Sequence, residues 1–516
     1  MAELEQLLGL FLAAVILAAA ARRVGAPYPV FLALGGALLA FIPGVRAFTI
    51  PPEVALALFV APVLLDAAHD ASLRDLRDNW APVTGLVVAA VCLTTAAVAV
   101  VAHLLMPSLP WAAAIALGAI VAPPDAVAAT SVLRPLRPPH RILTILEGES
   151  LLNDASALLI YRLAVGAVAA SSFSISAVAP AFLLAVCGSV AAGLALGWLV
   201  SRIMNRVQHV PTSIILQFVT TFGVWIVAEH IGLSGVLTTV CYAMTIARTA
   251  PERLDARIRL PSYAVWETVV FALNVLAFIF IGLQMGPILQ SLEPAERPRF
   301  FAVAGAVIVT VIVVRFVWHM SFNAAIRWRD RRFGFNPPRP MLRPTVGTGL
   351  VISWAGMRGI VSVAAAMALP AAFPYRDLIV LTTFCVVLGT LLIQGLTLKP
   401  LLRALALRDD DPVGRELIAA RERALHTGLA SFAADKSQAA ESVRQEFSAH
   451  LAYQRAETDA ADTTRDSHRE LHRLAIQSAR QAVLAMRDNH EIGDDAFNRL
   501  EEELDRLDIA VSSESK

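Results

Sequence analysis

The sequence predicts an all-α protein that crosses a membrane many times and ends in a helical tail. Of its 516 residues, 57% are hydrophobic and 16% are charged, and the mean hydropathy is +0.62. Soluble domains carry about 25% charged residues, so this composition is typical of a membrane protein. The apolar residues also gather in stretches that can cross a hydrocarbon core of about 30 Å. The net charge of +1 gives no indication of a nucleic-acid partner.

About thirteen apolar stretches are expected to be transmembrane helices. They cover residues 5–21, 27–43, 52–68, 81–106, 110–134, 147–170, 175–203, 212–230, 233–249, 263–289, 298–320, 346–370 and 376–402. The first stretch is expected to remain in the protein, because Arg22 and Arg23 follow its apolar run and no cleavage pattern is clear. We therefore predict a transmembrane domain over residues 1–402 and a cytoplasmic helical tail over residues 403–516, where helical spacing of small and apolar residues continues.

The arginines predict the orientation of the chain. Cytoplasmic loops collect Lys and Arg, and alternate loops of this chain are rich in Arg. The rich set holds Arg22, Arg23, Arg74, Arg77, Arg134, Arg137, Arg141, Arg202, Arg206, Arg248, Arg253, Arg257, Arg259, Arg327, Arg329, Arg331, Arg332, Arg339 and Arg343, and the poor set holds Arg46, Arg297, Arg299 and Arg376. We therefore expect the N-terminus outside the cell membrane and the C-terminus in the cytoplasm.

The fifth stretch is interrupted by Pro123 and Pro124, which are followed directly by Asp125. Each proline removes a backbone donor and frees a carbonyl that hydrocarbon cannot satisfy. A carboxylate at this depth costs roughly 2.5–3.5 kcal/mol on insertion scales. The break is therefore expected to line a polar cavity, and an intramembrane cation or proton site is the first hypothesis.

The sixth stretch carries four oxygen-bearing side chains, Glu149, Ser150, Asn153 and Asp154. On a helix Glu149 stacks with Asn153 and Ser150 with Asp154, so that the four form two adjacent rows. Carboxylate, amide and hydroxyl oxygens are the ligands that hard cations accept in place of water. The alternative is that these residues only make hydrogen bonds between helices, which would leave the Pro-Pro-Asp break unexplained.

The twelfth stretch carries a second interruption, in which Gly356 and Gly359 flank Arg358. Two glycines weaken a helix and allow it to unwind. Discontinuous helices at corresponding positions of two halves indicate an inverted-repeat transporter with its site near the membrane midplane. The alternative is that the glycines only permit close helix packing.

Arg315 follows a long apolar run and needs a carboxylate partner inside the protein, because a guanidinium keeps its charge. Glu149 and Asp66 are the expected partners. Asp66 could instead reach interfacial water at the end of the third stretch. Arg162 is interpreted as a side chain that reaches the membrane interface.

The motifs resemble those of the monovalent cation/proton antiporters, in the sodium/proton exchanger-like branch. The resemblance covers roughly residues 5–402 and excludes the tail. Its most specific motifs are Val121-Ala122-Pro123-Pro124-Asp125-Ala126-Val127-Ala128, Glu147-Gly148-Glu149-Ser150-Leu151-Leu152-Asn153-Asp154 and Gly356-Met357-Arg358-Gly359, and the segments 228–237 and 266–274 also resemble this family.

The resemblance implies a core of thirteen helices with inverted repeats and two crossed discontinuous helices. It implies that Asp154 carries cation and proton alternately, with Asp125 and Ser150 as further cation ligands. Asn153 and Glu149 would complete the site. The resemblance also implies that Arg315 pairs with Glu149 and Asp66, and that Arg358 is the arginine of the unwound twelfth helix.

An Asn-Asp pair such as Asn153 and Asp154 goes with electroneutral exchange in families of this kind. One departure matters: many members carry Thr-Asp where this chain has Pro124 and Asp125. Because proline has no hydroxyl, a backbone carbonyl or water has to replace that ligand here.

The expected function is antiport of a monovalent cation, Na⁺ before K⁺ or Li⁺, against H⁺, with a role in pH homeostasis. The protein is expected to be no enzyme, to need no cofactor and to form a homodimer in the lipid bilayer. The alternatives are K⁺/H⁺ exchange, a cation channel and an intramembrane hydrolase. The chain has no HExxH motif and few His residues within its apolar stretches, which argues against a metal-dependent hydrolase.

Overall fold

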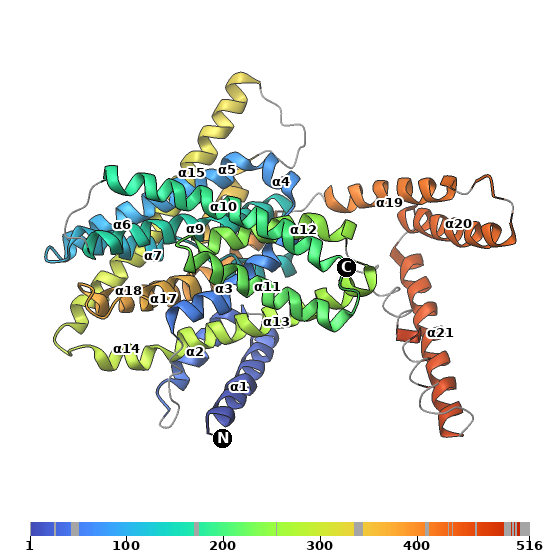
Figure 1. The fold of residues 1–516 in the computed structure, drawn as a ribbon, viewed down its shortest axis with the longest axis horizontal. Coiled ribbons are helices and arrows are strands. Elements are labelled where there is room, and N and C mark those ends of the chain that lie inside the picture. Colours follow the sequence, from blue (N-terminus) through green and yellow to red (C-terminus); the bar gives the residue numbers. More distant parts are fainter. Residues whose placement is uncertain are drawn as a thin grey trace. The chain divides into compact units, whose positions relative to one another are not determined.

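The computed structural model describes residues 2–24, 27–42, 51–169, 175–253, 255–334, 344–407, 412–431, 433–435, 437–459, 462–489, 497, 500 and 503–505. Every regular element within these residues is helical (Figure 1). The predicted all-α class is therefore confirmed. The chain divides into two compact units, residues 1–412 and 413–516, which are described separately.

The first unit holds the helices that correspond to the predicted apolar stretches. They are α1 (Ala2–Val24), α2 (Tyr28–Leu39), α3 (Pro52–Asp70), α4 (Leu73–Asp78), α5 (Trp80–Thr84), the π-helix η1 (Gly85–Ala90), α6 (Val91–Leu105), α7 (Trp111–Val121), α8 (Ala126–Leu133), the 3₁₀-helix η2 (Arg134–Leu136), α9 (His140–Ala169), α10 (Ile175–Met204), α11 (Val210–His230), α12 (Gly235–Arg253), α13 (Ala256–Leu283), α14 (Met285–Ser291), α15 (Arg297–Phe333), α16 (Val346–Trp354), α17 (Ile360–Met367) and α18 (Arg376–Leu405).

A helix or a pair of half-helices lies at each of the predicted stretches. Within the described residues, seven helical segments are long and apolar enough to cross a membrane by themselves. They are Trp80–Leu105, His140–Val168, Leu184–Met204, Val210–His230, Ala256–Gln290, Arg297–Phe333 and Arg376–Leu405. The number of thirteen crossings remains a prediction.

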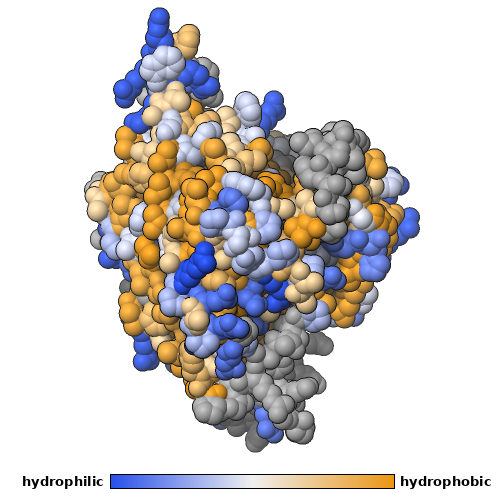
Figure 2. All heavy atoms as spheres, turned by 90° about the vertical axis from the view of Figure 1, so that its left-hand side faces the viewer, coloured by the Kyte–Doolittle hydropathy of each residue, from blue (hydrophilic) through white to orange (hydrophobic). Residues whose placement is uncertain are grey.

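The surface of this unit matches a lipid environment. Large apolar side chains that face outward include Leu12, Leu184, Val309, Val313 and Val317. Figure 2 shows broad hydrophobic areas around a group of hydrophilic residues on one face of the molecule. Apolar surface on this scale is unfavourable in water and favourable in contact with lipid.

The helices pack in two groups around the predicted site. One group, called here the broken-helix bundle, consists of α6–α9 and α15–α18, and it packs through α6 on α7, α7 on α9 and α15 on α18. The other, called the long-helix bundle, consists of α3 and α10–α12, in which α10 and α3 both pack on α12. Contacts of α17 and α9 with α3, and of α9 with α12, join the two bundles.

The second unit is a helical tail, as expected. It contains α19 (Pro412–Ser431), α20 (Gln438–Asp459) and α21 (Asp462–Asp488). In α21 the side chains of Ile476 and Val483 are buried, whereas Leu471 and Leu474 are exposed. α21 is therefore an amphipathic helix with Ile476 and Val483 on its buried side, whereas the two leucines of the predicted apolar pattern lie on its exposed side.

Candidate functional site

Both predicted interruptions are breaks in helices. α7 ends at Val121, and α8 begins at Ala126. Asp125 is the N-cap of α8, where its Oδ1 accepts a hydrogen bond from the backbone N–H of Val127 at 2.9 Å. The second break lies between Trp354, the last residue of α16, and Ile360, the first residue of α17. Both helices thus end next to residues that disfavour a helix. Pro123 and Pro124 lack a backbone N–H, and Gly356 and Gly359 weaken helical structure.

The two breaks are bonded to each other. The backbone N–H of Asp125 donates to the carbonyl of Met357 at 2.6 Å. The buried Arg358 donates from Nε to the carbonyl of Val121 at 3.0 Å and from Nη2 to that of Ala122 at 3.4 Å. Its guanidinium also bonds the carbonyl of Gly356. A positive charge therefore stabilises the carbonyl end of α7, where the last carbonyls lack helical partners because the helix ends.

Gly359 lets the second break approach the first. A Cβ atom at this position would overlap the carboxylate of Asp125. The backbone of Gly359 is extended, so the glycine is required for space and not for its conformational freedom. Any side chain here would push Asp125 out of its place.

Asp154, Asp125 and Ser150 line one small cavity of about 40 Å³. Asp154 and Ser150 come from α9, and Asp125 comes from the break between α7 and α8. Apolar residues of α3, among them Val60 and Leu64, close another side. A space of this size holds a few water-sized species, and carboxylate and hydroxyl oxygens are suitable ligands for a hard cation.

The structure separates the two rows of side chains that the sequence predicted on α9. Ser150 and Asp154 face the cavity, whereas Asn153 and Glu149 do not line it. Asn153 donates from Nδ2 to the carbonyl of Pro124 at 3.0 Å and thereby fixes the helix break. This second row therefore lies beside the cavity, and the expected part of Asn153 and Glu149 in cation or proton binding stays a prediction.

Glu149 instead forms a buried ion pair with Arg315. Nη1 and Nη2 of Arg315 lie 2.5 and 2.8 Å from Oε1 and Oε2 of Glu149. The two side chains are 3% and 2% exposed. Arg315 also donates to the carbonyl of Ile352 at 3.2 Å, so the pair connects α9 and α15 to the α16 half-helix. A bidentate geometry of this kind is the strongest form of such a pair.

The expected pairing of Arg315 with Asp66 is not found. The hydrogen bonds of Arg315 go to Glu149 and Ile352. Asp66 faces a different cavity of about 400 Å³ with Arg134 and Arg259. Side chains of α3 at positions 60, 63, 64 and 67 face the small cavity, and those at 65, 66 and 69 face the large one. Helical geometry therefore directs Asp66 away from the Arg315 side.

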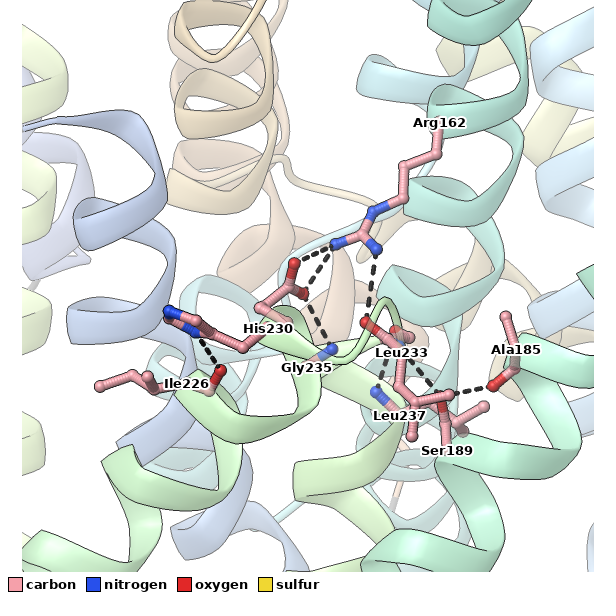
Figure 3. Close-up of polar contacts among 10 residues, drawn as sticks. Arg162, Ala185, Ser189, Ile226, His230, Leu233, Gly235 and Leu237 are labelled. Carbon is pink, nitrogen blue, oxygen red and sulfur yellow. Dashed lines mark hydrogen bonds and ion pairs between the residues drawn. The ribbon is translucent and has the colours of Figure 1, made fainter.

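Arg162 makes contacts that were not predicted from the sequence. One nitrogen, Nη2, lies 2.7 Å from both carboxylate oxygens of Glu229, and Nη1 donates to the carbonyl of Leu233 at 3.5 Å (Figure 3). Oε1 of Glu229 also accepts the backbone N–H of Gly235 at 2.9 Å. Arg162 therefore joins α9, which carries Asp154, to the turn between α11 and α12.

Two further polar residues line the small cavity, Asn274 of α13 and Ser362 of α17. Asn274 belongs to a segment that resembles the antiporters, but nothing in its spacing indicates a ligand. Ser362 lies in a run of small residues, where a serine cannot be distinguished from a packing residue. Neither could have been assigned to the site from local sequence.

Comparisons with known proteins agree with this architecture. The chain matches the family described as "Sodium/hydrogen exchanger, transmembrane" over residues 10–404. An uncharacterised Na⁺/H⁺ exchanger of Mycobacterium tuberculosis is 30% identical over 95% of this chain and 92% of its own length. A sodium, potassium, lithium and rubidium/H⁺ antiporter of Bacillus subtilis is 27% identical over 95% of this chain and 75% of its own length.

The fold is also that of a solved structure. The sodium proton antiporter of Methanocaldococcus jannaschii superimposes with a TM-score of 0.59 over 78% of this chain and 99% of that chain, at 17% identity. The family resemblance inferred from the motifs is confirmed by the family match over residues 10–404. The chain belongs to the sodium/hydrogen exchanger family.

Proposed function

We propose that this protein exchanges Na⁺ for H⁺ across the cell membrane, with Asp154 as the group that carries each in turn. The observation that carries the proposal is the position of Asp154, which faces a small cavity beside two bonded helix breaks. Asp125 and Ser150 add oxygens to the same cavity. Membership of the exchanger family supports the same reaction.

The cycle follows from the cost of a buried charge. An empty, ionised Asp154 is expensive to move through a low-dielectric environment, whereas a protonated or cation-bound Asp154 is neutral. Only the two neutral forms then switch readily between opening to one side of the membrane and opening to the other. Cation and proton therefore compete for one carboxylate and travel in opposite directions. Asn153 cannot take a second proton, and Glu149 is held in its ion pair with Arg315, so we expect one proton per monovalent cation.

K⁺ and Li⁺ are alternative substrates of the same site. The Bacillus subtilis relative is a sodium, potassium, lithium and rubidium/H⁺ antiporter. Pro124 supplies no side-chain oxygen, and its carbonyl already accepts the hydrogen bond from Asn153. The neutral oxygens that surround the cation thus decide among these ions.

The arrangement of the protein in the cell is part of the proposal. The distribution of Arg supports an N-terminus outside the cell and a C-terminus in the cytoplasm. The division into a transmembrane domain over residues 1–402 and a cytoplasmic tail over residues 403–516 follows from the same pattern. We expect the functional unit to be a homodimer.

The test is cation-induced proton flux in proteoliposomes that contain the full chain. Na⁺, K⁺ and Li⁺ are added separately to one side, and the internal pH is recorded. We expect saturable alkalinisation or acidification that reverses with the cation gradient. Asp154→Asn should abolish this flux, because the amide neither titrates nor neutralises a cation. Coupled exchange by a folded Asp154→Asn protein would exclude Asp154 as the carrier.

A further inference from the structure

Two side chains beyond the ligand set read from the sequence face the cavity of Asp154. Ser362 is the third residue of α17, and Asn274 lies in α13. Both line the same space of about 40 Å³ as Asp154. They reach the cavity from helices that contribute none of the three predicted ligands, so they surround it with oxygens from additional directions.

Within the described residues the hydroxyl of Ser362 has no hydrogen-bond partner, although this residue is only 1% exposed. A buried polar group without a partner costs about 1–3 kcal/mol, and each such group in a native protein therefore needs a reason. Ser353 of α16 provides the contrast, because its hydroxyl donates to the carbonyl of Gly349, four residues earlier, at 2.8 Å.

The helix break explains why Ser362 differs from Ser353. A serine inside a helix can satisfy its hydroxyl at the carbonyl four residues before it, as Ser353 does. The residue four positions before Ser362 is Arg358, which lies in the non-helical break. The local fold thus removes the usual partner and leaves the lone pairs of Ser362 available beside the carboxylate of Asp154.

The other oxygens near Asp154 are partly engaged. Oδ1 of Asp125 accepts the N–H of Val127, and the carbonyl of Pro124 accepts the amide of Asn153. A monovalent cation that loses its hydration shell needs several oxygens in its place. The set formed by Asp154, Asp125 and Ser150 is therefore incomplete without further neutral ligands.

We propose that Oγ of Ser362 and Oδ1 of Asn274 bind the transported cation and set the selectivity among Li⁺, Na⁺ and K⁺. This inference rests on the proposed function and names neutral ligands of the same site. Carboxylates attract every cation, whereas the number and position of dipolar oxygens decide which ion they hold best. Ser362 and Asn274 thus take the place of the hydroxyl that Pro124 lacks.

The experiment compares Ser362→Ala and Asn274→Ala with the wild-type chain and with Thr383→Val. Thr383 is a matched control, because its hydroxyl is also buried without a partner but lies in α18 and does not line the cavity. Two quantities are measured for Li⁺, Na⁺ and K⁺ at constant pH: the half-saturating cation concentration for exchange, and the rise in melting temperature that each cation causes. The second quantity reports binding without transport.

We expect each alanine variant to raise the half-saturating cation concentration about tenfold. A change of this size is expected when a charged ion loses one of its oxygen ligands. The cation-induced rise in melting temperature should shrink in parallel, and the ratio between Na⁺ and K⁺ should change. Ser362→Thr, which keeps the hydroxyl, and Thr383→Val should stay within about twofold of the wild type.

Folded Ser362→Ala and Asn274→Ala proteins with affinities within about twofold of the wild type for all three ions would overturn the inference. If Ser362→Ala does not fold, Ser362→Cys takes its place, because a thiol of similar size is a poor ligand for a hard cation. Wild-type protein without cation-driven proton flux would instead refute the proposed function. In that case the melting temperatures still decide whether Ser362 and Asn274 bind a cation.

Discussion

Nη2 of Arg162 lies 2.7 Å from each carboxylate oxygen of Glu229, and this pair links the helix that carries Asp154 to the long-helix bundle. Arg162 is in α9, and Glu229 is near the end of α11. The side chains are 46% and 34% exposed, so the pair contributes at most about 1 kcal/mol. The pair spans the two bundles, and alternating access would require these bundles to move relative to each other. The position of the pair therefore matters more than its strength.

Arg162→Gln should therefore change transport more than stability. If the pair forms in one access state only, its removal shifts the balance between the states by at most about fivefold. We expect the half-saturating Na⁺ concentration measured from one side of oriented proteoliposomes to change by up to this factor, with the melting temperature nearly unchanged. The charge exchange Arg162→Glu with Glu229→Arg should restore the wild-type value. Equal shifts from both sides would contradict a state-specific contact.

Arg315→Ala should destabilise the protein more than Arg358→Ala. Removal of Arg315 leaves Glu149 as a buried carboxylate without a partner, which typically costs about 3–5 kcal/mol. Removal of Arg358 leaves backbone carbonyls, which are neutral acceptors and cost less. Melting temperatures in one detergent decide between the two. The double variant Arg315→Ala with Glu149→Ala should recover part of the lost stability. Equal melting temperatures for the two single variants would contradict the prediction.

Exchange should be electroneutral. In the proposed cycle Asp154 is the one carrier, and Asn153 cannot bind a proton. The measurement is the rate and the equilibrium of exchange under an imposed potential, where each uncompensated charge contributes about 2.3 kcal/mol per 100 mV. A dependence on potential in ionophore-clamped vesicles would mean that a second proton moves. Asp125, which lines the same cavity, would then be the residue to replace.

Asp75, in the short α4 helix outside the long apolar segments, should make folding stability depend on pH. Burial acts to raise the pKa of its carboxyl, but hydrogen bonds from His140 and Ser72 outweigh burial and hold the pKa below the ordinary value of 3.8. A lowered pKa contributes stability that is present above that ordinary value and is lost as the pH falls through the folded-state pKa.

Asp75→Asn should accordingly lower the melting temperature at pH 7 and leave it almost unchanged at a pH below the folded-state pKa of Asp75. The difference between the wild type and this variant isolates Asp75 from the other carboxylates that protonate in acid. A difference that stays constant from pH 7 to the acid limit would show that the hydrogen bond between Asp75 and His140 does not depend on ionisation.

Deletion of the chain after residue 410 should leave exchange intact and alter at most its dependence on pH or cation concentration. Every proposed ligand precedes α18, and the tail forms its own compact unit. Proton flux of the truncated protein in proteoliposomes is the measurement. A correctly inserted truncation without any exchange would show that the tail takes part in the transport step itself.

The sequence alone determined the features that depend on local chain chemistry. Adjacent prolines remove backbone donors and glycines weaken a helix, so both breaks could be located from residues 123–125 and 356–359. The lengths of the apolar stretches predicted the helices, and the spacing of Ser150 and Asp154 predicted that these two residues share one helix face. The family motifs of α9 and the breaks pointed to Asp154 because they are contiguous in the chain, and Asp154 lines the small cavity, while its carrier role stays a prediction.

Only the tertiary structure decided which side chains from distant helices meet. Asp66 faces the opposite side of α3 from the small cavity, and Glu149 faces Arg315, because the rotation of each helix about its axis is set by packing. Asn274 of α13 and Ser362 of α17 line the same small cavity as Asp154 of α9, and no local pattern marks them. A cation shell is assembled from long-range contacts, and these contacts arise from packing in the folded chain.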